Sequence, residues 1–274
     1  MNTMIDHVRQ DHPPLTVAAL DVGNAVMTLG VLGIDSPDEA PRLLGKRSYT
    51  TPEHITDDEA HDIVAQGFAC MGAPKPTGAI LGCVVPRLTA PLRAALGEVC
   101  PTRPFVVGPG LKSGVRVRYK NPADLGADRV AAAVGAQALY GAPCITVSLG
   151  TTTHIEVVDT SGTFIGGVIC PGSALGAEAL DRAAARLPMV DLNAPRHVIG
   201  QSTQEAIQSG IMLGEAARID GLLDLIVEEL GYQAPIVLTG ESADQIGRLL
   251  RHRTKTQDPL VLIGLAEIWR RNAI

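Results

Sequence analysis

Residues 17–32 read VAALDVGNAVMTLGVL, an apolar run, a short turn and a second apolar run. Both runs are typical of strands in a mostly buried sheet. Gly23 and Asn24 are expected to supply the left-handed backbone that a tight hairpin turn favours. An acidic residue, Asp21, ends the first strand and has two interpretations. It caps the turn, or it handles a hydrated Mg2+ while the bare amides of the turn cradle a phosphate.

A second hairpin of the same kind is predicted at residues 144–159, which read CITVSLGTTTHIEVVD. Two halves that each open on such a hairpin indicate duplicated domains that face each other across a cleft. Strands and helices alternate along the chain, so the predicted fold class is α/β. We expect a flexible N-terminal arm at residues 1–15, an N-terminal domain at 16–124 and a C-terminal domain at 125–274.

This arrangement resembles the acetate and sugar kinase, heat-shock chaperone and actin superfamily. The resemblance implies two ribonuclease-H-like domains of the actin-like ATPase type, with the active site in the cleft between them. It also implies that the two paired hairpins bind the phosphates of ATP, for which their backbone amides and hydroxyl-rich turns are suitable ligands.

The composition excludes several classes of function. The chain has 274 residues, a net charge of -6 and 3% aromatic residues. It therefore lacks the basic surface and the stacking side chains that nucleic-acid binding needs, and we expect no nucleic acid and no membrane partner. Five widely spaced cysteines without a C-x-x-C pair argue against a disulfide framework or a zinc site and favour a cytoplasmic location.

Further elements are predicted from apolar spacing and from the positions of glycine and proline. They are a helix in residues 49–72 that opens at Pro52, a buried strand at 78–86, a helix at 88–100, a strand and an extended arm in 104–122, an Ala-rich helix at 125–141 that stops at Gly141, a strand, loop and helix in 162–188, a strand, turn and helix in 234–250, and an amphipathic helix at 258–272.

One long helix is predicted at residues 204–230. Ser202 and Glu205 fit a capping box that would open it. Two glycines within it, Gly210 and Gly214, would permit close packing against another helix. We therefore expect this helix to lie either in the core or at a dimer seam.

Eight blocks of the sequence together resemble the type III pantothenate kinases, in the order found in that family and over nearly the whole chain. The blocks are DVGN (21–24), CVVP (83–86), VGPGLKSGVRVRYKNP (107–122), GADRV (126–130), LGTTT (149–153), GGVICPG (166–172), STQEAIQSGI (202–211) and DPLVLIGLAEIW (258–269). The resemblance implies ATP-dependent phosphorylation of pantothenate to 4'-phosphopantothenate, the first step of coenzyme A biosynthesis.

The same resemblance implies a role for each matching residue. Asp128 would be the catalytic base, which takes the proton of the pantothenate hydroxyl as its oxygen attacks the γ-phosphorus. The ATP-binding residues would be Asp21, Val22, Gly23, Asn24, Ala25, Val26, Met27, Thr28 and Thr151. The pantothenate-binding residues would be Tyr119, Gly126, Ala127, Asp128, Arg129 and Thr203. Mg2+ would accompany ATP, and the protein would be a homodimer whose pantothenate pocket is completed by the neighbouring subunit.

Each of these residues also has a purely structural interpretation. Asp128 and Arg129 could be charges at the start of a helix, and Thr203 could be only part of a helix cap. Tyr119 could be an aromatic residue of the core or of a sheet edge. His154 is interpreted as a surface or core residue, and the histidine spacing gives no reason to assign a structural metal.

Four positions depart from the family pattern. Ala25 replaces a threonine and so removes a hydroxyl that could bind phosphate. Ser148 stands where the family has an aspartate assigned to a monovalent cation, K+ or NH4+, so we interpret it as a degraded cation position. Lys120 replaces an acidic residue, and Glu241 replaces the second of two glycines near the adenine side.

The sequence leaves three functions open. The first is a type III pantothenate kinase, weakened or inactivated by these departures. The second is a paralogue that binds nucleotide or an acyl-amide ligand for a regulatory purpose. The third is a kinase of another small hydroxylated carboxylate, which would share the mechanism and differ only in the pocket.

Overall fold

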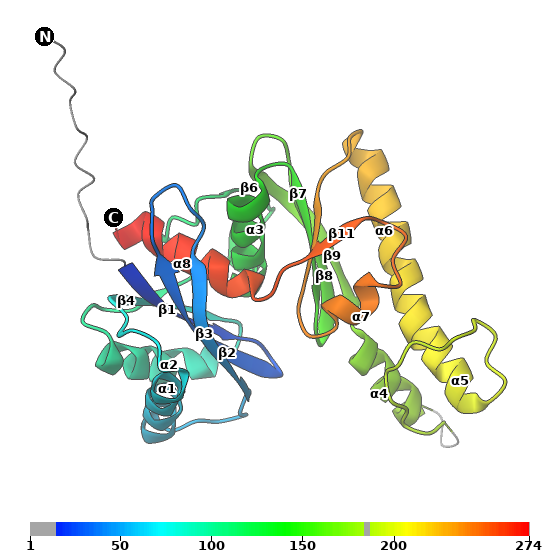
Figure 1. The fold of residues 1–274 in the computed structure, drawn as a ribbon, viewed down its shortest axis with the longest axis horizontal. Helices are drawn as coiled ribbons and strands as arrows, with labels where there is room; N and C mark the ends of the chain where they lie inside the picture. Colours follow the sequence, from blue (N-terminus) through cyan, green and yellow to red (C-terminus); the bar gives the residue numbers. More distant parts are fainter. Residues whose placement is uncertain (1–14, 184–186, 274) are drawn as a thin grey trace, which may run out of the picture.

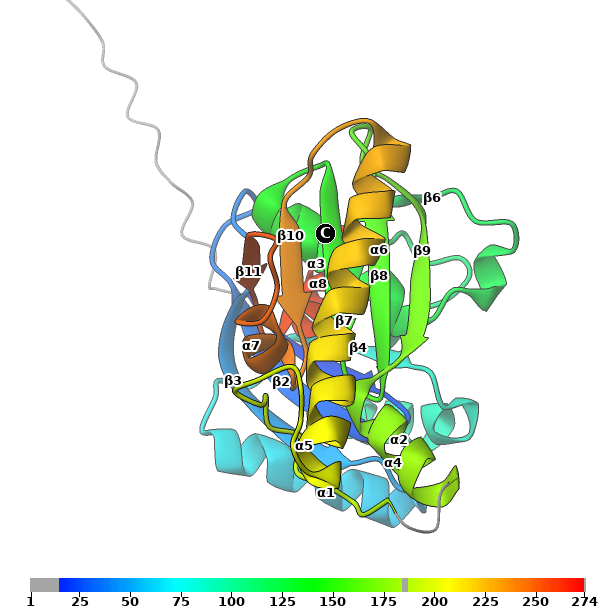
Figure 2. The same ribbon diagram turned by 90° about the vertical axis from the view of Figure 1, so that its right-hand side faces the viewer.

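The computed structural model describes residues 15–183 and 187–273, and the predicted N-terminal arm at 1–15 lies almost wholly outside them. The chain forms two mixed sheets (Figures 1 and 2). The first has the strand order β3-β2-β1-β4-β5. Its strands are β1 (Leu15–Val22), β2 (Val26–Ile34), β3 (Arg42–Thr50), β4 (Gly78–Cys83) and β5 (Phe105–Val106).

The second sheet repeats this pattern, with the order β11-β10-β7-β8-β9-β6. Its strands are β6 (Arg116–Val117), β7 (Cys144–Leu149), β8 (Thr152–Val158), β9 (Thr163–Pro171), β10 (Ile236–Thr239) and β11 (Thr254–Thr256). In each sheet three consecutive strands pair antiparallel: β1, β2 and β3 in the first sheet, and β7, β8 and β9 in the second. On the other side of each hairpin, β4 pairs parallel with β1, and β10 pairs parallel with β7. The α/β class and the duplication predicted from the two hairpins are confirmed.

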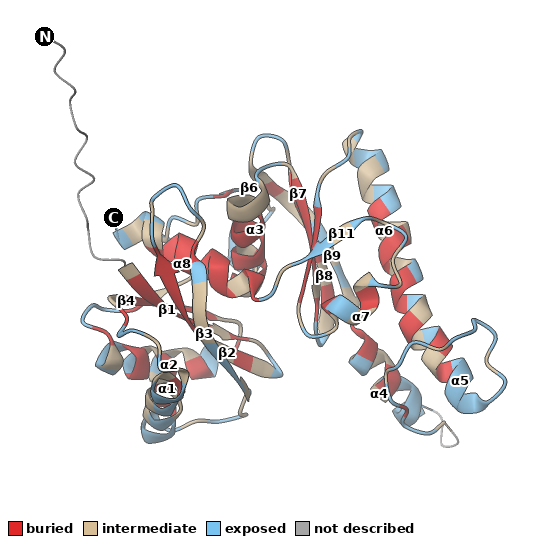
Figure 3. Ribbon diagram, in the orientation of Figure 1, coloured by how far each residue is buried: buried red, intermediate tan, exposed pale blue. Residues whose placement is uncertain are grey.

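The helices form three layers around the two sheets (Figure 3). Helices α1 and α2 pack on the outer face of the first sheet, and α6 and α7 pack on the outer face of the second. Helices α3 and α8 lie between the sheets and share one core with both. The helices are α1 (Asp57–Met71), α2 (Pro86–Val99), α3 (Ala127–Tyr140), α4 (Ser173–Ala183), α5 (Thr203–Gln208), α6 (Gly214–Leu230), α7 (Ala243–Gly247) and α8 (Leu260–Ala273).

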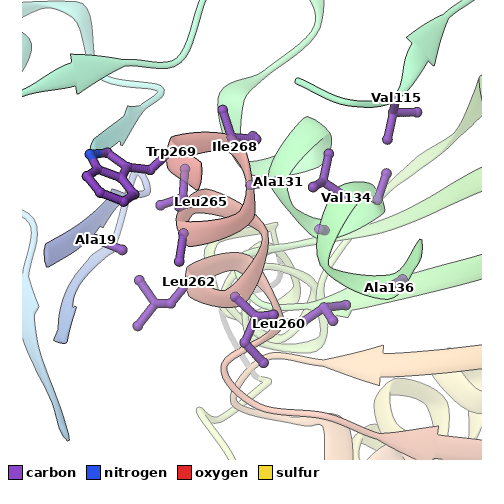
Figure 4. Close-up of a cluster of buried hydrophobic side chains, with 14 of the residues drawn as sticks. Ala19, Val115, Ala131, Val134, Ala136, Leu260, Leu262, Leu265, Ile268 and Trp269 are labelled. Carbon is purple, nitrogen blue, oxygen red and sulfur yellow. The ribbon is translucent and has the colours of Figure 1, made fainter. Parts of the chain in front are cut away.

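Helices α3 and α8 touch backbone to backbone (Figure 4). A Cβ at Gly264 would overlap the carbonyl oxygen of Ala131, and one at Gly135 would overlap that of Leu260. On its other side α8 reaches the first sheet, where the ring of Trp269 covers Gly78 of β4. This central pair therefore joins the two sheets. The division of the chain at residue 124 stays a prediction.

The structure corrects the expected turn geometry of the first hairpin. Neither Gly23 nor Asn24 has a positive φ, and the positive-φ residues of the described chain are glycines elsewhere. Gly23 is needed for another reason, because a Cβ there would lie 2.9 Å from the carbonyl oxygen of Val26. Close approach of the backbone, rather than left-handed geometry, selects glycine at this position.

Some predicted boundaries are also wrong. The helix expected to open at Pro52 begins at Asp57, because Thr56 and Glu59 form a capping box there. Residues up to Thr50 belong instead to β3, which pairs with β2. The strand predicted at 78–86 ends at Cys83, since Pro86 starts helix α2.

Two predicted helices differ in character from the expectation. The terminal helix α8 is buried along most of its length rather than amphipathic, because it is covered from both sides. The helix predicted at 204–230 is capped by Ser202 as expected, but Ser209–Leu213 form a π-helical turn between α5 and α6. Nothing lies within 4 Å of a Cβ built at Gly210 or Gly214, so these glycines permit no close contact within the described chain.

Two absences apply to the part of the chain that the structure describes. No helix there has the length and apolar character needed to cross a bilayer. All five cysteines are free, which agrees with the prediction of no disulfide framework.

The close crossing of α3 and α8 leads to a prediction about the stability of the protein. We expect Gly264→Ala to lower the free energy of unfolding by about 1–3 kcal/mol, because the added methyl group forces α3 and α8 apart. The matched control is Gly221→Ala in α6, where nothing lies within 4 Å of the new Cβ; it should raise stability by roughly 0.5–1 kcal/mol. Urea unfolding of the three proteins measures both effects, and equal stability of Gly264→Ala and wild type would contradict the tight crossing.

Candidate active site

The first predicted phosphate-binding turn, between β1 and β2, is held by the backbone and by one threonine. The amide of Gly23 donates to the carbonyl of Val26 at 3.0 Å, and the Thr51 hydroxyl donates to the carbonyl of Gly23 at 2.8 Å. Asn24 and Ala25 are exposed at the tip, whereas the side chains of the predicted ATP ligands Val22 and Met27 are buried. Those two residues can offer only backbone groups to a nucleotide.

The second turn, between β7 and β8, is supported by two neighbouring loops. The amide of Gly172 donates to the carbonyl of Thr151 at 3.0 Å, and a Cβ at Gly172 would overlap the carbonyl oxygen of Gly150. From the other side Gly240, with a φ of 97°, lies against the backbone of Leu149. The Thr151 side chain is left exposed at the tip of this supported turn.

Two carboxylates come together beside the first turn. Asp21 ends β1, and Asp128 lies in the first turn of α3. Burial raises the pKa of Asp21 to about 7, and the charge of Asp128 adds to the rise. The Oδ1 atom of Asp21 is buried and accepts no hydrogen bond from the described chain. Two acidic groups whose charges act on each other favour a proton or a cation nearby.

This arrangement fits a nucleotide-bound Mg2+. Mg2+ is usually held by one or two carboxylates together with phosphate oxygens and water. No three His, Cys, Asp or Glu side chains among residues 15–183 and 187–273 gather into a metal site of their own. The unpartnered Oδ1 of Asp21 is an oxygen of the kind that such an ion takes as a ligand, and both interpretations of this residue stay predictions.

Helix α3 presents Asp128 at its N-terminal end. The helix begins after Gly126, and a Cβ at Gly126 would overlap Oδ1 of Asp128, so glycine leaves the space that the carboxylate occupies. The Asp128 side chain is 27% exposed, in contrast to the buried Asp21 oxygen. Backbone amides at a helix start favour negative charge nearby. Asp128 is thus the accessible carboxylate of the pair.

Arg129 points away from Asp128 into the protein. Its Nε donates to Oε1 of Glu156 at 2.8 Å, and its side chain is only 5% exposed. The guanidinium carbon lies 5.9 Å and 5.8 Å from the ring centroids of Tyr119 and Phe164. Burial raises the pKa of Glu156 to about 7, although hydrogen bonds from Arg129 and Thr146 oppose the rise. Much of the fork expected to bind substrate is therefore engaged within the protein.

Thr203 does not lie beside these groups. It starts the short helix α5, where Ser202 supplies the cap. In Figure 1, α5 is drawn at the lower right, with the second sheet and α4 between it and α3. The structure thus brings Asp21, Asp128, Arg129 and Tyr119 into one region and leaves Thr203 apart.

His154, which the sequence analysis interprets as a surface or core residue, also lies in this region. His154 on β8 lies with its Nδ1 4.0 Å from Oδ2 of Asp128, and its Nε2 is 2.6 Å from the Thr152 hydroxyl. The available signal is the alternation along β8, which places Thr152, His154 and Glu156 on one face and Thr153, Ile155 and Val157 on the other. That face is the one turned toward α3.

Comparison with known proteins agrees with this geometry. The sequence profile of a family described as "Type III pantothenate kinase" matches residues 17–225. The chain belongs to the type III pantothenate kinase family. Proteins that carry this name include one from Koribacter versatilis, 38% identical over 259 residues, covering 92% of this chain and 94% of the relative. Another, from Frankia alni, is 36% identical over 255 residues, covering 93% and 98%.

Solved structures support the fold of this pantothenate kinase family member. The ethanolamine utilization protein EutJ from Carboxydothermus hydrogenoformans superposes with a TM-score of 0.54 at 15% identity, covering 93% of this chain and 90% of that one. A ROK hexokinase from Thermus thermophilus gives 0.51 at 16% identity, with coverage of 93% and 98%. These likenesses confirm the predicted actin-like ATPase fold.

The pKa of Asp21 generates a stability prediction. Because the folded protein holds this pKa above its unfolded value, ionisation of Asp21 costs stability as the pH rises toward and through 7. We expect Asp21→Asn to raise the melting temperature by several degrees at pH 8 and by much less at pH 5, without Mg2+ or ATP. Asp38→Asn, at an exposed position, is the matched control, and a gain from Asp21→Asn that stayed constant across pH would contradict the assignment.

Proposed function

We propose that this chain transfers the γ-phosphoryl group of ATP to the primary hydroxyl of pantothenate, giving 4'-phosphopantothenate for coenzyme A biosynthesis. Membership of the type III pantothenate kinase family supports the reaction class. The observation that carries the assignment of roles is the pair of carboxylates, Asp21 buried and Asp128 accessible, beside the first phosphate-binding turn.

Each of these residues would have a separate role in phosphoryl transfer. The backbone of both hairpin turns, with Thr28 and Thr151, would contact the phosphates, and Asp21 would hold the Mg2+ that neutralises their charge. Asp128 would accept the proton of the pantothenate hydroxyl during attack on the γ-phosphorus. Tyr119, Gly126, Ala127 and Arg129 would form the near wall of the pantothenate pocket.

The second function left open by the sequence, a regulatory ligand-binding paralogue, is favoured by one observation. The tip of the first turn is exposed at Ala25 and so carries no hydroxyl there for phosphate. That function predicts saturable ATP binding without phosphoryl transfer. A coupled kinase assay with pantothenate and ATP, alongside calorimetric titration with ATP, separates the two functions.

Asp128→Asn tests the proposed base. The variant keeps the shape of the side chain and loses its basicity, so we expect phosphoryl transfer to fall at least about 100-fold while ATP and pantothenate still bind. Asp62→Asn, on the exposed side of α1, is the control and should keep wild-type turnover. Near-normal turnover of Asp128→Asn, with wild type active, would show that another group is the base.

Ser148 makes a prediction about monovalent cations. The side chain is half-buried on β7 and offers a dipole where the family places a full negative charge. Loss of a charge about 3 Å from a cation forfeits on the order of a few kcal/mol at an effective dielectric near 20. We expect the initial rate to be nearly indifferent to K+ and NH4+ at fixed ionic strength, and Ser148→Asp, alone or with Ala25→Thr, to raise the rate and restore the dependence. Strong activation of wild type by K+ would contradict this.

We further propose a homodimer in which Thr203 of one subunit completes the pantothenate pocket of the other. Within one chain Thr203 lies apart from Asp128. A second subunit would bring its own Thr203 to that site. Three large apolar side chains near α5, Met189, Val198 and Ile199, are between 59% and 84% exposed, and such a patch commonly marks a protein contact. Light scattering at micromolar concentration measures the mass, and a monomer would contradict the proposal. A cytoplasmic location stays a prediction.

A further inference from the structure

Two side chains on the polar face of β8, Thr152 and His154, lead to the proposed base, Asp128. The Thr152 hydroxyl lies 2.6 Å from Nε2 of His154, and the opposite ring nitrogen, Nδ1, lies 4.0 Å from Oδ2 of Asp128. The His154 side chain is 17% exposed, and its ring has a polar neighbour at each of the two nitrogens. The assignment of roles to residues 21–28, 126–129 and 151 gives no task to this histidine.

Charge and burial determine which nitrogen of His154 carries the proton. Burial lowers the pKa of His154, and Arg129 acts in the same direction while Asp128 opposes both. A neutral imidazole has one N–H and one lone pair. An Nδ1 lone pair facing the Asp128 carboxylate would be repelled by it, whereas an Nδ1–H is attracted. The Thr152 hydroxyl can then donate its proton to the lone pair on Nε2.

We propose that His154 is a positioning residue for Asp128: its Nδ1–H holds one carboxylate oxygen, and the other oxygen is left to accept the proton of the substrate hydroxyl. The inference rests on the proposed kinase function. The charge of Asp128 favours this tautomer of His154, the Thr152 hydroxyl donates to Nε2, and β8 places the ring beside the start of α3. His154 itself touches neither substrate nor phosphate in this role.

The distance is consistent with this role. A separation of 4.0 Å exceeds a hydrogen bond by about 1 Å, which a rotation of the partly exposed Asp128 side chain covers. Catalytic hydrogen bonds are commonly long before substrate binds and shorten in the complex. The second oxygen, Oδ1, lies over Gly126, and this glycine has no side chain that would block it.

Three substitutions at His154 separate a donor at Nδ1 from mere space filling. Asparagine places an amide N–H close to the position of Nδ1, glutamine places one near Nε2, and phenylalanine keeps the volume without a donor. We expect His154→Phe and His154→Gln to lower kcat by about 10- to 100-fold, with the KM for ATP changed less than about twofold. His154→Asn should restore kcat to within about threefold of wild type. The exposed His54→Asn is the matched control.

A second measurement reads the tautomer directly. In 15N-labelled protein, the two-bond 15N–1H correlation spectrum should show His154 as the neutral Nδ1–H tautomer near pH 8. Asp128→Asn should weaken that preference, because the attracting charge is gone. Dominance of the Nε2–H tautomer in wild type would overturn the proposal, as would a kcat of His154→Phe within twofold of wild type.

The two proposals fail in different ways. If wild type does not phosphorylate pantothenate, the proposed function fails, and the tautomer and its response to Asp128→Asn still decide whether His154 holds Asp128. If wild type is active and the three His154 variants are equally active, the kinase function stands and the positioning role is wrong.

Discussion

The backbone contact between α3 and α8 is the constraint on which the rest of the structure depends. Two glycines, Gly135 and Gly264, let the helices approach until side chains no longer separate them. Helix α3 packs on the second sheet and carries Asp128 at its start, while α8 packs on the first sheet, which carries Asp21. The start of α3 also meets the first sheet directly, because Ala127 lies against Gly82, the partner of Asp21 on β4, and this packing places Asp128 beside Asp21.

The site concentrates negative charge beyond what its own cations balance. Asp128 acts electrostatically on both Asp21 and Glu156, and Arg129 is hydrogen-bonded to Glu156. Burial is the main cause of the raised pKa values of Asp21 and Glu156, and the charge of Asp128 adds to both rises. The Mg2+ that accompanies ATP would offset this negative charge, so the site suits a metal-bound nucleotide better than a nucleotide without its metal ion.

The sequence predicted the fold through its repeated hairpin and predicted the site mainly through family resemblance. Local patterns located most strands and helices, because apolar runs and caps act over a few residues. They could not reveal that α8 is covered from both sides, since this depends on partners distant in the chain. At Gly23 the sequence indicates a turn, and only the backbone geometry shows that close approach to Val26, instead of a left-handed conformation, selects the glycine. The nearness of His154 to Asp128 could not be predicted either, because the two residues lie on different elements.

The position of α8 also determines the order in which the molecule can be completed. Strand β1 is among the first described elements that the ribosome makes and α8 is the last, yet they share one core. Contacts between such distant segments form late and slowly, because a long loop must close before these contacts can stabilise the fold. Until α8 arrives, the inner face of the first sheet and the side of α3 that faces α8 stay uncovered, and a nascent chain at that stage exposes apolar surface that chaperones recognise.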